Sequence, residues 1–301
     1  MTQPNVKPLE VFNAEVIQAP LRGLFMNMDR AIERKLKEAI ANRQHEAERH
    51  FSLILIMLRI TINSYEGMCF ILTTEERDPK RKDRFALLLP PANRQIFDLL
   101  FSLIYMKDDF PARSLEYELS GYRQLREMYD TLFARYGTLP KWQAYFDDLR
   151  DLVQTMEKYL AITPAQKANP ENIKRWVGPA KLKGKPSKSK PFLEFLDDWL
   201  YREISAQAHL NAAGLAEIAG FVLASLATEE MRERIEKRTI LQYIFRQFTR
   251  TLICVLAITS EIDSFCQLNH RTALAQLWVL LGGYADEAME VYKERYQAML
   301  A

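Results

Sequence analysis

Apolar residues recur at helical spacing along most of this chain, and that periodicity limits the fold more than any other feature. The clearest case is residues 112–136, where leucines and tyrosines return every three or four positions, as on one face of a helix. Glycine is scarce, at 10 of 301 residues, and no segment shows the alternation of a half-buried strand. The sequence therefore predicts an all-α fold, a multi-helix bundle with long central helices and a C-terminal helical extension.

Proline and glycine mark where these helices begin and end. Prolines 91, 111 and 140 suit first helical turns, and Gly137 and the pair Gly282-Gly283 are expected stops. We expect helices over about 24–48, 51–73, 92–107, 112–136, 140–160, 192–227, 228–268, 271–281 and 286–300.

The chain is long enough for one large domain or two small ones. We expect an N-terminal arm over residues 1–22, a helical bundle over 23–227 and the C-terminal extension over 228–301. Within the bundle, residues 161–191 contain five prolines and many lysines, which predicts a basic loop. It is either a solvated linker or a flexible arm that contacts RNA phosphates, and its candidate RNA-binding residues are Lys181, Lys183, Lys185, Lys188 and Lys190.

Composition narrows the class of protein. The 41 basic and 39 acidic residues give a net charge of +2, which excludes a generally basic nucleic-acid coat and leaves only a local anion site. The three cysteines form no CxxC pair and are expected to be buried free thiols. The apolar stretches at 51–62 and 251–258 are shorter than a membrane span. We therefore expect a cytoplasmic protein without a membrane partner.

No motif at metal-ligand spacing is visible. His45 and His50 flank two glutamates, but they are five residues apart, whereas a zinc-protease helix needs histidines four apart on one face. No Glu-x-x-His pattern of a di-iron bundle occurs. We expect no metal and no cofactor.

Arg202 and His209 are the strongest catalytic candidates. Seven steps of about 100° return to nearly the same helix face, about 10 Å further along the axis, so both side chains could reach one phosphate. Arginine binds phosphate in a forked geometry, and histidine can move a proton on or off a ribose hydroxyl. The alternative is a structural polar network inside the bundle. Arg43 and His50 repeat the same spacing by chance.

Two segments together resemble an uncharacterised bacterial all-helical family. Arg94-x3-Asp98 is similar to its first motif, with aspartate where glutamate is expected, and Tyr201-Arg202-x2-Ser205-x3-His209 is similar to its second. The resemblance covers about residues 25–225 and brings no activity with it.

The second motif is also similar to the HEPN superfamily, helical bundles that often dimerise so that two Arg-x(4–6)-His motifs form one ribonuclease site. This likeness implies Arg202 as phosphate binder, His209 as acid or base and a homodimer. Glu203 stands where a small polar residue is usual.

The resulting expectation is a HEPN-like metal-independent RNA endonuclease, a toxin or phage-defence effector. Five residues are expected to support its site: Arg94, Asp98, Tyr201, Glu203 and Ser205. The alternative is a non-catalytic helical protein- or ligand-binding module that uses a groove around Arg94, Asp98 and His209.

Overall fold

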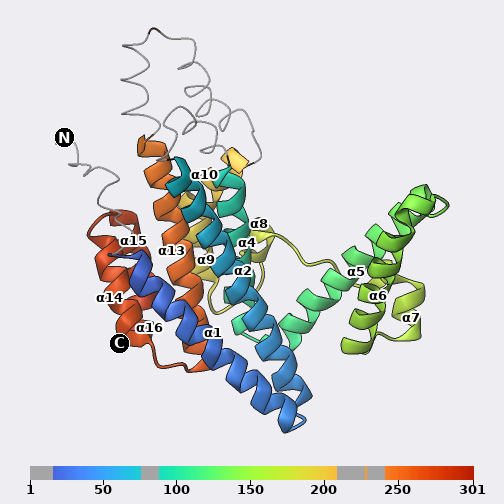
Figure 1. Cartoon of the computed structure of the whole chain (residues 1–301). Helices are drawn as coiled ribbons and strands as arrows, with labels where there is room; N and C mark the ends of the chain where they lie inside the picture. Colours follow the sequence, from blue (N-terminus) through green and yellow to red (C-terminus); the bar gives the residue numbers. More distant parts are fainter. Residues whose placement is uncertain (1–15, 76–87, 209–227, 229–240) are drawn as a thin grey trace. The chain divides into compact units, whose positions relative to one another are not determined.

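A computed structural model describes residues 16–75, 88–208, 228 and 241–301 of the chain (Figure 1). These residues form helices joined by short turns, and no strand occurs among them. The predicted all-α class is confirmed. Contacts group the chain into two compact units, residues 1–107 with 179–301 and residues 108–178.

The first unit is built on four long helices: α1 (Gln18–Ala41), α2 (His45–Glu75), α4 (Leu89–Lys107) and α13 (Leu241–Cys266). α1 and α2 form a hairpin, and α13 packs on both α2 and α4. Two side-chain contacts between α4 and α13 share one sequence offset, because Asn93–Gln247 and Lys107–Glu261 are both 154 residues apart. The two helices therefore run parallel and in register.

Helix α13 is the centre of this unit. Every residue from Gln247 to Asp263 is buried, so the stretch at 251–258 is a core helix, as its composition predicts. α2 is not buried on all sides, because Ile56, Ile60 and Phe70 are exposed. A helix with neighbours on only some of its faces leaves apolar residues in solvent even when its sequence is apolar all round.

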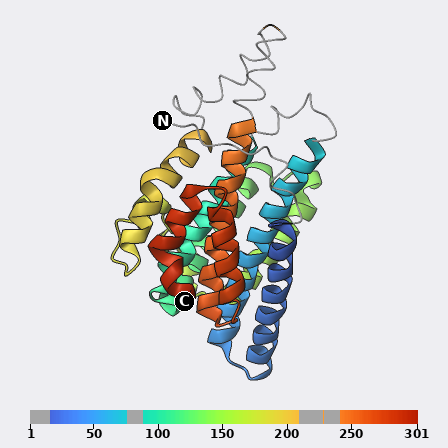
Figure 2. The same ribbon diagram turned by 90° about the vertical axis from the view of Figure 1, so that its left-hand side faces the viewer.

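Shorter helices complete the first unit. α8 (Pro179–Leu182), α9 (Lys190–Leu196) and α10 (Arg202–Ala208) precede the long α13 in the chain, and a π-helical turn, Asp197–Tyr201, joins α9 to α10. After α13 come α14 (Arg271–Gly282), α15 (Asp286–Val291), a second π-helical turn (Tyr292–Tyr296) and α16 (Gln297–Leu300). α14, α15 and α16 lie against α13 (Figure 2).

The second unit is a helical hairpin closed by a short helical segment. It comprises α5 (Phe110–Tyr136), a 3-10 turn (Pro140–Trp142), α6 (Gln143–Tyr159), α7 (Pro164–Ala168) and a second 3-10 turn (Pro170–Asn172). Its core contains Tyr122, Val153, Leu160, Ile162 and Ile173. Gly137 follows the last residue of α5, as predicted, but with a right-handed φ of −62°.

Residues 161–191 differ from the predicted basic loop. Prolines 164, 170 and 179 each begin a short helical turn, because the fixed φ of proline suits the first helical position. Arg123 of α5 donates hydrogen bonds of 2.6 Å to the carbonyls of Glu171 and Ile173. These contacts make residues 161–178 part of the second unit.

The contact grouping also differs from the expected domain boundaries. It separates residues 108–178, which the sequence analysis places inside the bundle. Residues 18–22, expected in an N-terminal arm, belong to α1. The boundary expected at residue 228 lies next to segments outside the described residues and stays a prediction.

Among the described helices, the stretch His45–Phe70 of α2 is long and apolar enough to cross a membrane by length and composition alone. Half of its most apolar part is buried inside the protein. A single such stretch is weak support for a membrane span.

Candidate functional site

Helices α4 and α10 lie side by side, and together with the π-helical turn that precedes α10 they bring four of the predicted site residues together. The Arg94 guanidinium donates a 2.7 Å hydrogen bond to the Ser205 hydroxyl. It also lies 5.0 Å from the centre of the Tyr201 ring, and its Nε lies 3.6 Å from Asp98 Oδ2. The two resembling motifs therefore meet in space.

Tyr201 is the buried member of this cluster. Its ring packs on Phe97 and Phe101 of α4. Burial raises the pKa of the Tyr201 hydroxyl, and the Asp98 carboxylate adds to the rise while Arg94 opposes it. The phenol therefore stays protonated at neutral pH and can act only as a neutral hydrogen-bonding group.

Arg202 points away from that cluster. It is next to Tyr201 in the chain, so its side chain leaves the helix about 100° further round, and the side chain is 65% exposed. Its guanidinium lies 3.1 Å from Asp198 and 3.5 Å from Asp197. Asp197 is buried and belongs to the π-helical turn. The two aspartates hold Arg202 at the surface of the first unit.

The candidate RNA-binding lysines fall into two groups. Lys181, Lys188 and Lys190 are exposed, and Lys190 lies 3.7 Å from Glu194. Lys183 pairs with Asp197, the carboxylate that Arg202 also approaches, and the ammonium of Lys185 lies 5.3 Å from the Tyr105 ring. The basic segment is therefore anchored beside Arg202 at Asp197.

The second catalytic candidate, His209, lies outside the described residues. Its distance from Arg202, like its position relative to Arg94 and Asp98, stays a prediction.

Glu203 of α10 contacts α13. Its Oε2 accepts hydrogen bonds from Arg246 at 2.9 Å and from Arg250 at 2.5 Å. Both arginines belong to α13, so Glu203 fastens α10 to α13. The two arginines are one helical turn apart and differ in burial. The side chain of Arg250 is 0% exposed, whereas that of Arg246 is 49% exposed.

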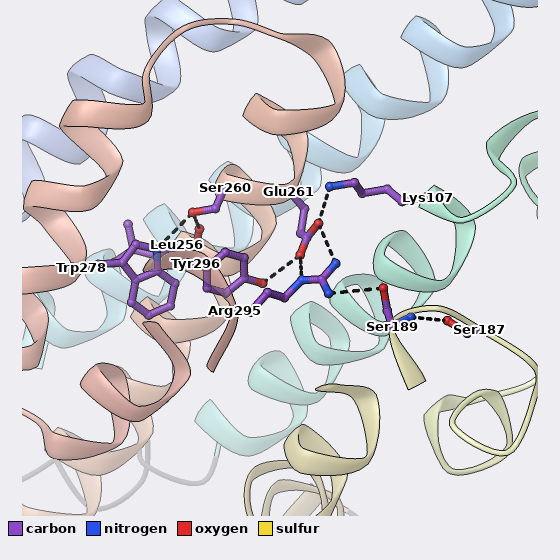
Figure 3. Close-up of polar contacts among 9 residues, drawn as sticks. All are labelled: Lys107, Ser187, Ser189, Leu256, Ser260, Glu261, Trp278, Arg295 and Tyr296. Carbon is purple, nitrogen blue, oxygen red and sulfur yellow. Dashed lines mark hydrogen bonds and ion pairs between the residues drawn. The ribbon is translucent and has the colours of Figure 1, made fainter. Parts of the chain in front are cut away.

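A second polar cluster, which the sequence analysis missed, surrounds Glu261 of α13 (Figure 3). Glu261 is 0% exposed. Its carboxylate lies 2.5 Å from Lys107 Nζ and 2.5 Å from Arg295 Nε, and it accepts a 3.2 Å hydrogen bond from Tyr296. Arg295 also donates to Ser189 at 3.3 Å. The cluster therefore ties α4, α13 and the C-terminal π-helical turn to the start of α9.

Two opposing effects act on the Glu261 carboxyl. Burial raises its pKa, but the Lys107 and Arg295 charges outweigh burial, and the net pKa lies below its ordinary value. Glu261 is thus ionised at neutral pH. We assign the cluster to fold stability, because the buried carboxylate is already engaged by Lys107, Arg295 and Tyr296. Its members are too far apart in the chain for any local motif to reveal them.

Metal and thiol chemistry find little support in the described part of the chain. No group of three histidine, cysteine or carboxylate side chains there could hold a metal ion. The three cysteines are buried and free, as predicted. Burial raises the pKa of Cys69 to about 11 and of Cys266 to about 12, so neither is an activated nucleophile.

Comparisons with known proteins add no assignment: no protein-family model matches the chain, and neither does any curated protein or solved structure.

Proposed function

We propose that this chain is a HEPN-like, metal-independent RNA endonuclease, a toxin or phage-defence effector that works as a homodimer in the cytoplasm. The observation that carries the proposal is the placement of Arg202. Its guanidinium is exposed and lies near Asp197. Lys183 of the lysine-rich segment pairs with the same Asp197, so the segment lies beside Arg202. An RNA backbone needs such a local group of cations in a chain of nearly balanced charge.

The aspartates around Arg202 do not prevent phosphate binding. Both side chains of the Arg202–Asp198 pair are exposed, and such surface ion pairs contribute about 0–1 kcal/mol to folding stability. A phosphate offers the guanidinium a bidentate, charge-assisted contact that is stronger. Arg202 can therefore exchange Asp198 for a phosphate at little cost.

In the proposed reaction, His209 takes the proton from a ribose 2′-hydroxyl, which then attacks the adjacent phosphorus. Arg202 balances the negative charge that builds up on the phosphoryl oxygens. The bond to the 5′-oxygen breaks, and that oxygen leaves with a proton returned by the imidazolium. The products are a 2′,3′-cyclic phosphate end and a 5′-hydroxyl end.

The test is cleavage of a broad panel of labelled RNAs by purified protein in the presence of a chelator. His209→Ala is expected to lower the rate about 100-fold or more, and Arg202→Ala should lower it comparably. Arg43→Ala and His50→Ala, which carry the same seven-residue spacing elsewhere, are the matched controls and should keep activity. A melting curve for each variant separates lost chemistry from lost folding.

Two results would contradict this assignment. One is a protein that cleaves no RNA in the panel, and the other is cleavage that persists in folded His209→Ala.

One observation favours the alternative, a non-catalytic protein- or ligand-binding module. Arg94 is only 22% exposed and is engaged by Ser205 and Tyr201, as in a packing network. For such a module, Arg202→Ala and His209→Ala would leave folding intact and no nuclease activity would be found in any variant.

A further inference from the structure

Arg250 of α13 is a buried cation whose hydrogen-bonding groups are incompletely used. Its side chain is 0% exposed, and Nη2 donates to Glu203 Oε2. Its Nε and Nη1 are buried and have no acceptor in the described structure. Buried guanidinium N–H groups without acceptors are unfavourable, because the water that they lose on folding is not replaced.

Charge around Arg250 is unbalanced as well. Arg246 and Arg250 both donate to one oxygen of Glu203, Oε2, whereas the other oxygen, Oε1, is buried without a donor. Among the described residues, two guanidinium groups thus share a single carboxylate, which leaves a local excess of one positive charge there. A further anion would balance this excess and supply the acceptors that Arg250 lacks.

The arginines are held in place by their surroundings. Next to them, Asn93 of α4 donates to the backbone and the side chain of Gln247, each at 3.0 Å, and it accepts a hydrogen bond from Thr251. This buried layer fixes α4 against α13. Arg250 is fully buried in this arrangement, whereas Arg246, one helical turn earlier, is half-exposed.

The chemistry of the pair matches a phosphate-class oxyanion. Two guanidinium groups present planar sets of N–H donors, and a tetrahedral phosphate offers several charged acceptors to both. The Glu203 carboxylate now fills the place that such an anion would take, and its side chain is partly exposed. A metal cation is disfavoured there by the excess positive charge.

We propose that Arg246 and Arg250 form an anion-binding site, that Glu203 is its internal occupant, and that a phosphate group displaces Glu203 when it binds. The ligand class is free phosphate or the phosphomonoester of a nucleotide. This site does not include Arg202 and does not depend on the proposed RNA cleavage.

The test measures binding of inorganic phosphate and of adenosine 5′-monophosphate by titration calorimetry at constant ionic strength. Glu203→Gln removes the negative charge that competes with the ligand but keeps the shape of the side chain. The affinity for phosphate is therefore expected to rise about tenfold or more. In Arg246→Ala, a change at a half-exposed residue, affinity should fall at least tenfold. Arg59→Ala is the matched control, because Arg59 forms an ion pair with Asp29 on the surface of α1 and α2.

Equal binding of phosphate and the nucleotide would identify the phosphate group alone as the ligand, and tighter binding of the nucleotide would identify a phosphomonoester. Either result supports the site if Glu203→Gln and Arg246→Ala change the affinity in opposite directions. No measurable binding to folded Glu203→Gln would overturn the proposal, as would equal affinity in Arg246→Ala and Arg59→Ala.

Discussion

Replacement of Glu261 by alanine tests how far the buried cluster stabilises the first unit. The change leaves Lys107 and Arg295 without their shared carboxylate, and both side chains are largely buried. Removing one partner of a buried pair costs about 3–5 kcal/mol. We take the lower end because both cations keep some contact with solvent, and add about 1 kcal/mol for the buried Tyr296 hydroxyl that loses its acceptor.

The expected loss is therefore about 4 kcal/mol of unfolding free energy. With a urea slope of about 3 kcal/mol per molar, the unfolding midpoint of Glu261→Ala falls by about 1.3 M. The measurement is urea unfolding followed by circular dichroism at pH 7. Glu33→Ala is the control, because Glu33 is paired with Lys37 on the exposed side of α1 and its loss should shift the midpoint very little.

The same cluster predicts a pH dependence. The folded pKa of Glu261 is lowered, so its contribution is fully present above the unfolded value of about 4.3. It is lost as pH falls through the folded pKa. The stability gap between the natural chain and Glu261→Gln should accordingly shrink below about pH 4. A gap that stays constant from neutral to acid pH, or a Glu261→Ala midpoint equal to that of Glu33→Ala, would refute the reasoning.

Three further predictions concern other parts of the chain. A thiol reagent at pH 8 should label no cysteine until urea unfolds the protein, because burial raises the pKa of all three thiols; labelling of the folded chain would contradict their burial. Thr163→Ala removes the capping box of α7 and should lower the free energy of unfolding by about 1 kcal/mol. Amide exchange at Gln166 should become faster, and an unchanged exchange rate would show that the cap is not formed. Arg94→Ala loses its hydrogen bond to Ser205 and should cost about 1 kcal/mol, since its partner Asp98 is partly exposed; an unchanged melting temperature would mean that Arg94 is solvated.

The sequence predicted helix positions correctly where they depend on residues close together in the chain. The helix at 112–136 follows from side chains three and four residues apart, and α5 begins and ends within two residues of that range. The helices expected at 271–281 and 286–300 also match, except that the second contains a π-helical turn. The prolines of 161–191 were misread, because proline ends a helix in one context and begins one in another.

Of the candidate site, the contact of Arg94 with Tyr201 and Ser205 could be expected only through the resemblance of the two motifs. Residues that are 111 positions apart leave no periodic signal of their proximity. The partners of Glu203 illustrate the same limit, because nothing near residue 203 in the chain indicates Arg246 or Arg250.

The sequence by itself determined the all-α class, the positions of most described helices and the free, buried state of the cysteines. Each of these depends on hydrophobic periodicity or on residue type, which a linear chain displays directly. Only the tertiary structure decided that residues 108–178 form a separate unit. It also decided that Glu203 pairs with arginines of α13 and that Glu261 pairs with both Lys107 and Arg295. These pairings depend on which helix faces meet, and the energy of a buried charge is defined only once its distant partners are in place.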